Sequence, residues 1–230
     1  PIAKISTRIE AGTDMKLVLF DCDGTLVDSA VRIHETMRRA FVAYGHPEPT
    51  LAETKTIIGL SLDYAIARLL GRHRIDDEVL AIRVKFKSLF AEVHSDPNMM
   101  EQLFPGIAEL IDGLAARGDV AIGAVTGNSR RGLTHVLDLH GLAPRFTVSR
   151  TADDCPSKPH PAMVLECCAE AGFNPADAVI IGDAVFDMEM AVKAGSHAIG
   201  VAWGYGEIAD LQDAGAGAIV WHPEEILKLV

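Results

Sequence analysis

The sequence is poor in cysteine, in aromatic residues and in positive charge. Four of its 230 residues are cysteine, 6% are aromatic, and 32 acidic residues outnumber 21 lysines and arginines, which gives a net charge of −11. This acidic excess argues against nucleic acid and against an anionic membrane surface as partners. An anionic substrate would therefore need a local source of positive charge, such as a metal ion or a lysine.

Long apolar runs are also absent, because every run is shorter than the roughly 20 residues that span a bilayer. The cysteines lack the C-x-x-C spacing of a zinc site, and Cys167 and Cys168 are sequence neighbours, which rarely pair with each other. Together with Cys22 and Cys155 they are interpreted as the reduced thiols of a cytoplasmic protein.

What the chain has is enough apolar sequence for a sizeable core. At 49% hydrophobic residues and this length, it suits one domain with an insertion or two modest domains. Residues 1–14 lack the apolar core of a signal peptide and precede a methionine at position 15. We regard them as an N-terminal extension and exclude them from the predicted fold.

Short apolar stretches alternate with helical patterns over most of the chain. Strands are predicted at 17–20, 120–125, 146–149, 178–181 and 198–202, with an edge strand at 218–221. The stretches between the later strands have helical periodicity and end at glycines. This order predicts an α/β fold in which helices cover both faces of a doubly wound parallel sheet.

The segment between the first and second strands departs from that alternation. It contains four helical patterns and no convincing strand. Ser29 and Ser61 stand where two of the helices begin, and Thr50 with Glu53 forms a capping box for a short helix that is predicted to end at Gly59. The segment is therefore predicted to be an all-helical insertion.

Polar residues follow the predicted strands. Residues 21–25 (DCDGT) follow the first strand, residues 126–128 (TGN) follow the second, and residues 182–187 (GDAVFD) follow the fourth. Lys158 precedes the helix that leads to the fourth strand. Ligands bind beyond the carboxyl ends of the strands in such sheets. The sequence therefore predicts an active site at this edge.

The carboxylates of these segments suit phosphoryl transfer. A carboxylate is a fair nucleophile toward phosphorus once its charge is neutralised, which is the role considered for Asp21. Two carboxylates one residue apart either divide nucleophilic from acid/base work or clamp a cation together. Asp23 is able to move protons, Asp21 with Asp183 is a plausible pair of direct Mg²⁺ ligands, and Asp187 is placed in a second layer.

The remaining polar residues suit the phosphoryl oxygens. Lys158 supplies a point charge and Thr126 a hydroxyl, while Gly127 and Asn128 are expected to bring backbone N–H groups close. Gly24 lets the backbone turn tightly beside the phosphate.

Four ordered motifs resemble those of the haloacid dehalogenase superfamily. They are residues 21–26 (DCDGTL), Thr126, Lys158 and residues 182–187 (GDAVFD). The resemblance implies Mg²⁺ as cofactor, an aspartyl-phosphate intermediate on Asp21, and a backbone carbonyl of Asp23 on the metal as well as acid/base catalysis. It also places Thr25 among the phosphate-binding residues.

The same resemblance implies a division into domains. Residues 15–30 and 101–230 would form a Rossmann-like catalytic core, and residues 31–100 a helical cap. This cap resembles the small cap of the subgroup that contains phosphoglycolate phosphatases and β-phosphoglucomutases.

The choice of reaction within the superfamily depends on a few residues. Dehalogenation is disfavoured because Asp23 is an acid where dehalogenases lack one, and no insertion lysine stands in the context of the phosphonate-cleaving branch. Thr25 and residues 58–62 (IGLSL) look more like the phosphoglycolate phosphatase-like members than like the phosphomutases.

The resulting prediction is a Mg²⁺-dependent phosphatase, monomeric or homodimeric, that acts on a small phosphorylated metabolite. The best single guess for that metabolite is 2-phosphoglycolate. Alternatives are a phosphomutase of the β-phosphoglucomutase type, a pyrophosphatase or nucleotidase, and a non-enzymatic module resembling a response-regulator receiver. The helical insertion and the order of the acidic residues count against the receiver.

Overall fold

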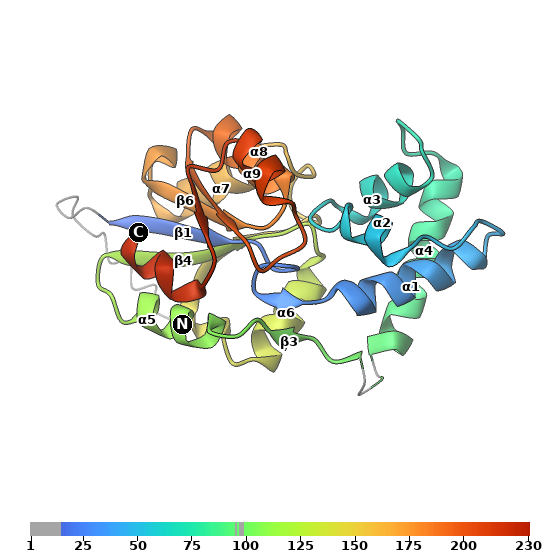
Figure 1. The fold of residues 1–230 in the computed structure, drawn as a ribbon, viewed down its shortest axis with the longest axis horizontal. Coiled ribbons are helices and arrows are strands. Elements are labelled where there is room, and N and C mark those ends of the chain that lie inside the picture. Colours follow the sequence, from blue (N-terminus) through green and yellow to red (C-terminus); the bar gives the residue numbers. More distant parts are fainter. Residues whose placement is uncertain (1–14, 95, 97–98) are drawn as a thin grey trace, which may run out of the picture.

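A computed structural model describes residues 15–94, 96 and 99–230, so the N-terminal extension at 1–14 lies outside the described residues. Six parallel strands form the main sheet, which confirms the predicted α/β fold (Figure 1). In spatial order they are β5 (Phe146–Arg150), β4 (Val120–Val125), β1 (Lys16–Phe20), β6 (Ala178–Gly182), β7 (His197–Val201) and β8 (Ala218–Val220).

Side chains of the central strand alternate between two cores. Val18 and Phe20 of β1 enter one apolar cluster, whereas Leu17 and Leu19 enter the other, and all four are fully buried. Such continuous burial is the pattern of a parallel strand covered on both faces.

Helices cover both of these faces (Figure 1). One face carries α5 (Ile107–Ala115), α6 (Arg130–Leu139) and the C-terminal 3₁₀ helix η4 (Pro223–Lys228). The other carries α7 (Ala162–Ala171), α8 (Val185–Ala194) and α9 (Ile208–Asp213). Two short 3₁₀ turns, η2 (Ala143–Arg145) and η3 (Pro175–Asp177), lead into β5 and β6.

Four helices form a second body beside the carboxyl edge of the sheet (Figure 1). They are α1 (Ala30–Val42), α2 (Leu51–Lys55), α3 (Leu62–Leu69) and α4 (Asp77–His94). Their apolar sides enclose a separate core that includes Met37, Ile66 and Ile82. We therefore propose that residues 31–100 form the cap and that residues 15–30 and 101–230 form the catalytic core.

The chain enters and leaves the cap through a small antiparallel ribbon that the sequence did not predict. It pairs β2 (Val27–Asp28) with β3 (Gln102–Leu103). Strands of two residues are too short to show an alternating pattern, so periodicity gives no signal for them.

The predicted helix after Thr50 is shorter than expected. It ends at Lys55, not at Gly59, and the Leu60 N–H donates to the Ile57 carbonyl in a turn. Ile57 and Ile58 are buried in the cap core, and Gly59 takes φ +100°, a left-handed conformation that favours glycine. Burial of two adjacent isoleucines therefore replaces another helical turn.

The N-cap residues of the helices in this domain differ in their hydrogen bonds. Thr50 forms the predicted capping box, in which its Oγ1 accepts from the Glu53 N–H at 3.1 Å and its own N–H donates to Glu53 at 2.7 Å. Ser29 and Ser61 stand at the predicted N-caps, yet neither side chain makes a capping hydrogen bond.

All four cysteines are buried and free. Within residues 15–94, 96 and 99–230, no helix is both long and apolar enough to cross a membrane.

We predict that Thr50→Ala lowers the free energy of unfolding by about 1 kcal/mol, because one helix N–H then loses its acceptor. Ser61→Ala is the matched control and should change it by a few tenths at most, since the Ser61 hydroxyl caps nothing. Chemical denaturation of the two variants beside the wild type measures both values. An equal loss of unfolding free energy in the two variants would contradict the assignment of the N-cap hydrogen bond to Thr50 alone.

Candidate active site

The residues singled out from the sequence meet at one edge of the sheet. Asp21 directly follows β1, Thr126 follows β4, Lys158 lies between β5 and α7, and Asp183 follows β6. These strands are neighbours in the sheet, so their carboxyl ends bring the side chains together.

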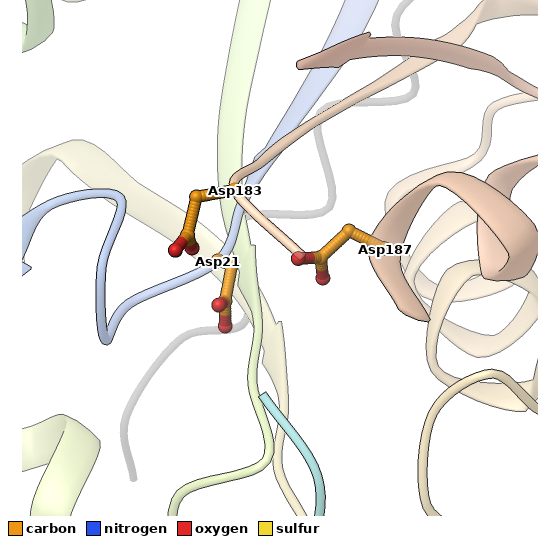
Figure 2. Close-up of side chains that lie close together, drawn as sticks. All are labelled: Asp21, Asp183 and Asp187. Carbon is orange, nitrogen blue, oxygen red and sulfur yellow. The ribbon is translucent and has the colours of Figure 1, made fainter. Parts of the chain in front are cut away.

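Three buried carboxylates form the centre of the site. Oxygen atoms of Asp21, Asp183 and Asp187 lie within 4.8 Å of one another (Figure 2). Lys158 Nζ is 2.8 Å from Asp21 Oδ1 and 2.5 Å from Asp187 Oδ1. One ammonium group, which contacts two of the three carboxylates, is thus buried with all three, and this leaves an excess of negative charge out of contact with water.

This excess shifts the proton affinities of the cluster. Burial, followed by the charges of Asp21 and Asp187, raises the pKa of Asp183 to about 8. Burial also raises the pKa of Asp187 to about 6, although Lys158 opposes the shift. For Lys158 itself, burial lowers the pKa, but the two adjacent carboxylates together outweigh it and the ammonium stays charged.

The cluster has the properties of a divalent-cation site. Asp21 Oδ2 is buried and accepts no hydrogen bond from any described residue. Hard oxygen donors with excess negative charge are what Mg²⁺ prefers. The residues present therefore fit the cofactor predicted from the sequence.

Backbone and hydroxyl groups fix the orientation of Asp183. Thr25 Oγ1 donates to its Oδ1 at 3.1 Å, and the Tyr205 N–H donates to its Oδ2 at 2.8 Å. A Cβ atom added at Gly24 would stand 2.3 Å from Oδ2, and one at Gly204 would stand 2.2 Å from the Asp183 Cβ. Only glycine at these positions leaves room for the carboxylate.

Asp23 lies beside the cluster and is held differently. Its side chain is buried, and Asn128 Nδ2 donates to its Oδ2 at 3.0 Å. Burial, and after it the charge of Asp21, raises the pKa of Asp23. A carboxyl group that holds its proton more tightly than usual is suited to serve as a general acid.

The loop after β4 differs from the prediction in one respect. The predicted role of the Asn128 N–H is beside the phosphate, whereas in the structure this N–H donates to Thr126 Oγ1 at 3.1 Å, inside the loop. Gly127 instead lies against the cap, because a Cβ there would be 2.5 Å from the carbonyl oxygens of Gly59 and Leu60.

Two aromatic residues of the site were missed. Trp203 Nε1 donates to the Thr25 carbonyl at 3.0 Å, and the Tyr205 hydroxyl donates to Asp28 at 2.8 Å while accepting from the Ser29 N–H at 2.9 Å. Both follow β7. Extending the search for polar residues to the end of the fifth predicted strand would have found them.

A buried ion pair at the cap junction was also missed. Arg32, near the start of α1, contacts the carboxylate of Glu101, which lies just before β3, and both side chains are almost fully buried. The Arg32 guanidinium also lies over the Phe90 ring of α4, 4.6 Å from its centroid. The pair thus joins the two chain segments that connect the cap to the core. Its partners are 69 positions apart in the sequence, so no local sequence pattern predicts their contact.

Comparison with known proteins leads to the same family as the four sequence motifs. Residues 18–201 match the family of haloacid dehalogenase-like hydrolases. The chain belongs to this family. Its recognition from the four motifs is confirmed.

Three relatives illustrate the match. A phosphoglycolate phosphatase from Mannheimia succiniciproducens is 26% identical over 95% of this chain and 99% of its own length. "Probable phosphatase IndB" from Dickeya dadantii is 31% identical over 89% and 88%. A solved structure from Bacteroides vulgatus, provisionally assigned as a β-phosphoglucomutase, is 25% identical with a TM-score of 0.76, covering 94% of this chain and 87% of that one.

We predict that Mg²⁺ raises the melting temperature, and that the increase is larger at pH 8 than at pH 6. The folded pKa of Asp183 lies above its ordinary value of 3.8, so without metal the fold loses stability from this group as the pH rises from about 4 to about 8. Over the same range fewer protons compete with the ion for the carboxylates. Thermal melts in EDTA and in excess Mg²⁺ at both pH values measure the difference.

Asp183→Asn provides the control for this experiment. It removes a carboxylate that must otherwise be ionised in the interior, so it should raise stability in EDTA and abolish most of the Mg²⁺ effect. An equal Mg²⁺-induced increase at both pH values in the wild type would contradict the assignment.

Proposed function

We propose that the protein is a Mg²⁺-dependent phosphatase, a phosphoric monoester hydrolase that acts through an aspartyl-phosphate on Asp21. The observation that carries the proposal is that two carboxyl groups close together in the sequence have different surroundings. Asp21 lies in ion-pair contact with the buried Lys158, whereas Asp23, two residues on, is held by an amide and retains its proton more tightly. Different surroundings divide the two roles.

In the first step an Asp21 oxygen attacks phosphorus and the bond to the leaving oxygen breaks. Asp23 donates its proton to that oxygen, so the product leaves as a neutral alcohol and the phosphoryl group remains on Asp21. Lys158 and the Thr126 hydroxyl are the groups proposed to neutralise and orient the phosphoryl oxygens.

In the second step Asp23, now ionised, takes a proton from a water molecule. The water oxygen attacks phosphorus, the bond to the Asp21 oxygen breaks, and inorganic phosphate is released. Asp23 ends protonated and Asp21 ionised, so both return to their starting states.

Asp21, Asp183 and the Asp23 backbone carbonyl would hold the metal, and Asp187 would support it from a second layer. A bound Mg²⁺ neutralises the charge of the nucleophile and of the phosphoryl oxygens. Gly24, Thr25 and Gly127 complete the proposed phosphate site, and Asn128 borders it while its side chain holds Asp23.

The substrate proposed from the relatives is a small phosphorylated metabolite. A relative named phosphoglycolate phosphatase matches along nearly the whole chain, so 2-phosphoglycolate is the first compound to test. The four free thiols favour the cytoplasm as the compartment. A monomer or a homodimer remains the proposed assembly.

A phosphomutase is the second candidate, because a solved structure assigned provisionally as a β-phosphoglucomutase shares the fold. A phosphomutase must hold a sugar by its hydroxyl groups while the sugar phosphate changes its orientation in the site. The cap residues that line the same cavity as Asp23 are largely apolar, among them Ile33, Met37 and Phe86. Such a surface offers a sugar few hydrogen bonds, so hydrolysis is favoured.

We predict that Asp21→Asn abolishes turnover of p-nitrophenyl phosphate in Mg²⁺, because a neutral amide is a poor nucleophile toward phosphorus. The assay is release of nitrophenolate, with circular dichroism as the check on folding. Asp138→Asn is the control: this exposed acidic residue of α6 lies outside both the cluster and the cavity beside Asp23, and the variant should retain near-normal rates. Normal activity in the Asp21 variant would exclude the covalent mechanism.

Asp23→Asn is predicted to slow hydrolysis of alkyl phosphates by about 10²–10⁴-fold, the usual contribution of a general acid or base. The loss in the first step should be smaller with p-nitrophenyl phosphate, whose leaving group departs without a proton. Comparison of burst rates and steady-state rates for the two substrate types tests this difference. Identical losses on both would argue that Asp23 serves the structure and not proton transfer.

A further inference from the structure

A cavity of about 630 Å³ lies between cap and core on the side of Asp23. Asp23, Gly127 and Asn128 line its core side, and side chains of α1 and α4 line its cap side. A proton delivered by Asp23 would therefore reach a leaving group that occupies this space. The cavity volume falls within the roughly 300–1,000 Å³ of sites that bury drug-sized ligands.

The cavity persists although the cap is in contact with the core. The Ser61 N–H of the cap donates to Ser157 Oγ of the core at 2.9 Å, and Gly127 lies against the Gly59 and Leu60 carbonyls. At the other junction, Lys55 of the cap lies over the Tyr205 ring of the core, with its Nζ 5.3 Å from the ring centroid. The space is thus present between bodies that already touch at two places.

The cap wall of this cavity is apolar and partly aromatic. Phe86 and Phe90 of α4 stack with their centroids 5.9 Å apart and their planes 26° apart, and both line the space. Met37 and Ile58 add further apolar surface. Glycolate has one methylene group and would leave most of this surface without a partner, whereas a ring-sized body would cover it.

Two cations at the cavity have no ion-pair partner among the described residues. Lys87 comes from α4 and Arg131 from α6, so cap and core each contribute one. Arg83, by contrast, is paired with Asp63 at 2.9 Å. Asp153 also lines the cavity, and its carboxylate accepts from the Arg130 N–H at 2.8 Å. In a chain with a net charge of −11, the two unpaired cations still form a local site for an anion.

We propose that the natural substrate is a phosphate monoester whose alcohol has an apolar body of about the size of a ring and carries a second negative group. The body lies against Phe86 and Phe90, and the negative group reaches Lys87 and Arg131. This inference rests on the proposed phosphatase activity and specifies its leaving group.

Three alkyl phosphates with similarly poor leaving groups test the proposal on the wild-type enzyme in Mg²⁺. They are 2-phosphoglycolate, benzyl phosphate and 4-carboxybenzyl phosphate. We expect kcat/KM for benzyl phosphate to exceed that for 2-phosphoglycolate by at least about ten-fold, because the ring buries apolar surface. The carboxylate should add about three-fold or more by pairing with exposed cations.

The outcomes separate this inference from the proposed function. If 2-phosphoglycolate is hydrolysed best, the leaving-group assignment is wrong and the phosphatase stands. If none of the three nor p-nitrophenyl phosphate is hydrolysed, the phosphatase itself is wrong.

Two lysine variants test whether Lys87 causes the preference for the carboxylated substrate. Lys87→Gln should reduce the preference for 4-carboxybenzyl over benzyl phosphate by about three-fold, the worth of one exposed ion pair. Lys85→Gln on the same helix is the matched control, since Lys85 does not line the cavity, and should leave the preference unchanged. Equal effects of the two variants would overturn the role of Lys87.

Phe86→Leu tests the apolar wall and keeps most of its volume. It should raise KM for benzyl phosphate several-fold more than KM for 2-phosphoglycolate, which does not reach the ring. A uniform change in kcat on both substrates would mean that Phe86 supports the fold only.

Discussion

The contact of Lys158 with Asp21 and Asp187 is the constraint on which the rest of the site depends. Burying one ammonium beside three carboxylates is unfavourable unless each group is held and the remaining charge is met. The sheet fulfils this by bringing the ends of β1 and β6 side by side, and glycines leave room for the carboxylate of Asp183. The excess negative charge that makes the cluster costly also makes it receptive to a divalent cation.

Much of this arrangement could be predicted from the sequence, because its main determinants are local. Continuous apolar runs identify strands buried on both faces, and parallel strands align their carboxyl ends, so residues after Phe20, Val125 and Gly182 had to meet. The capping box at Thr50 was likewise visible because both of its partners lie within four residues.

What escaped prediction depends on contacts between distant segments or on burial. Arg32 finds Glu101 only when the cap has folded, and Tyr205 fixes Asp183 through its backbone N–H, which any residue type would supply. The early end of α2 follows from burial of Ile57 and Ile58, and a helical pattern alone does not reveal which neighbour covers them. The side chains of the catalytic groups were thus foreseen better than the backbone groups that hold them.

The placement of Asp23 separates the chemistry from the choice of substrate. Asp21 contacts the lysine and belongs to the carboxylate cluster, whereas Asp23 lines the cavity whose far wall belongs to the cap. The groups proposed to act on phosphorus therefore come from the sheet edge, and those proposed to meet the leaving group come largely from α1 and α4. A cap built from helices with its own core can change its lining without disturbing the buried carboxylates. For this reason we connect the four motifs with the reaction, and propose that the apolar wall and its two cations distinguish one phosphate ester from another.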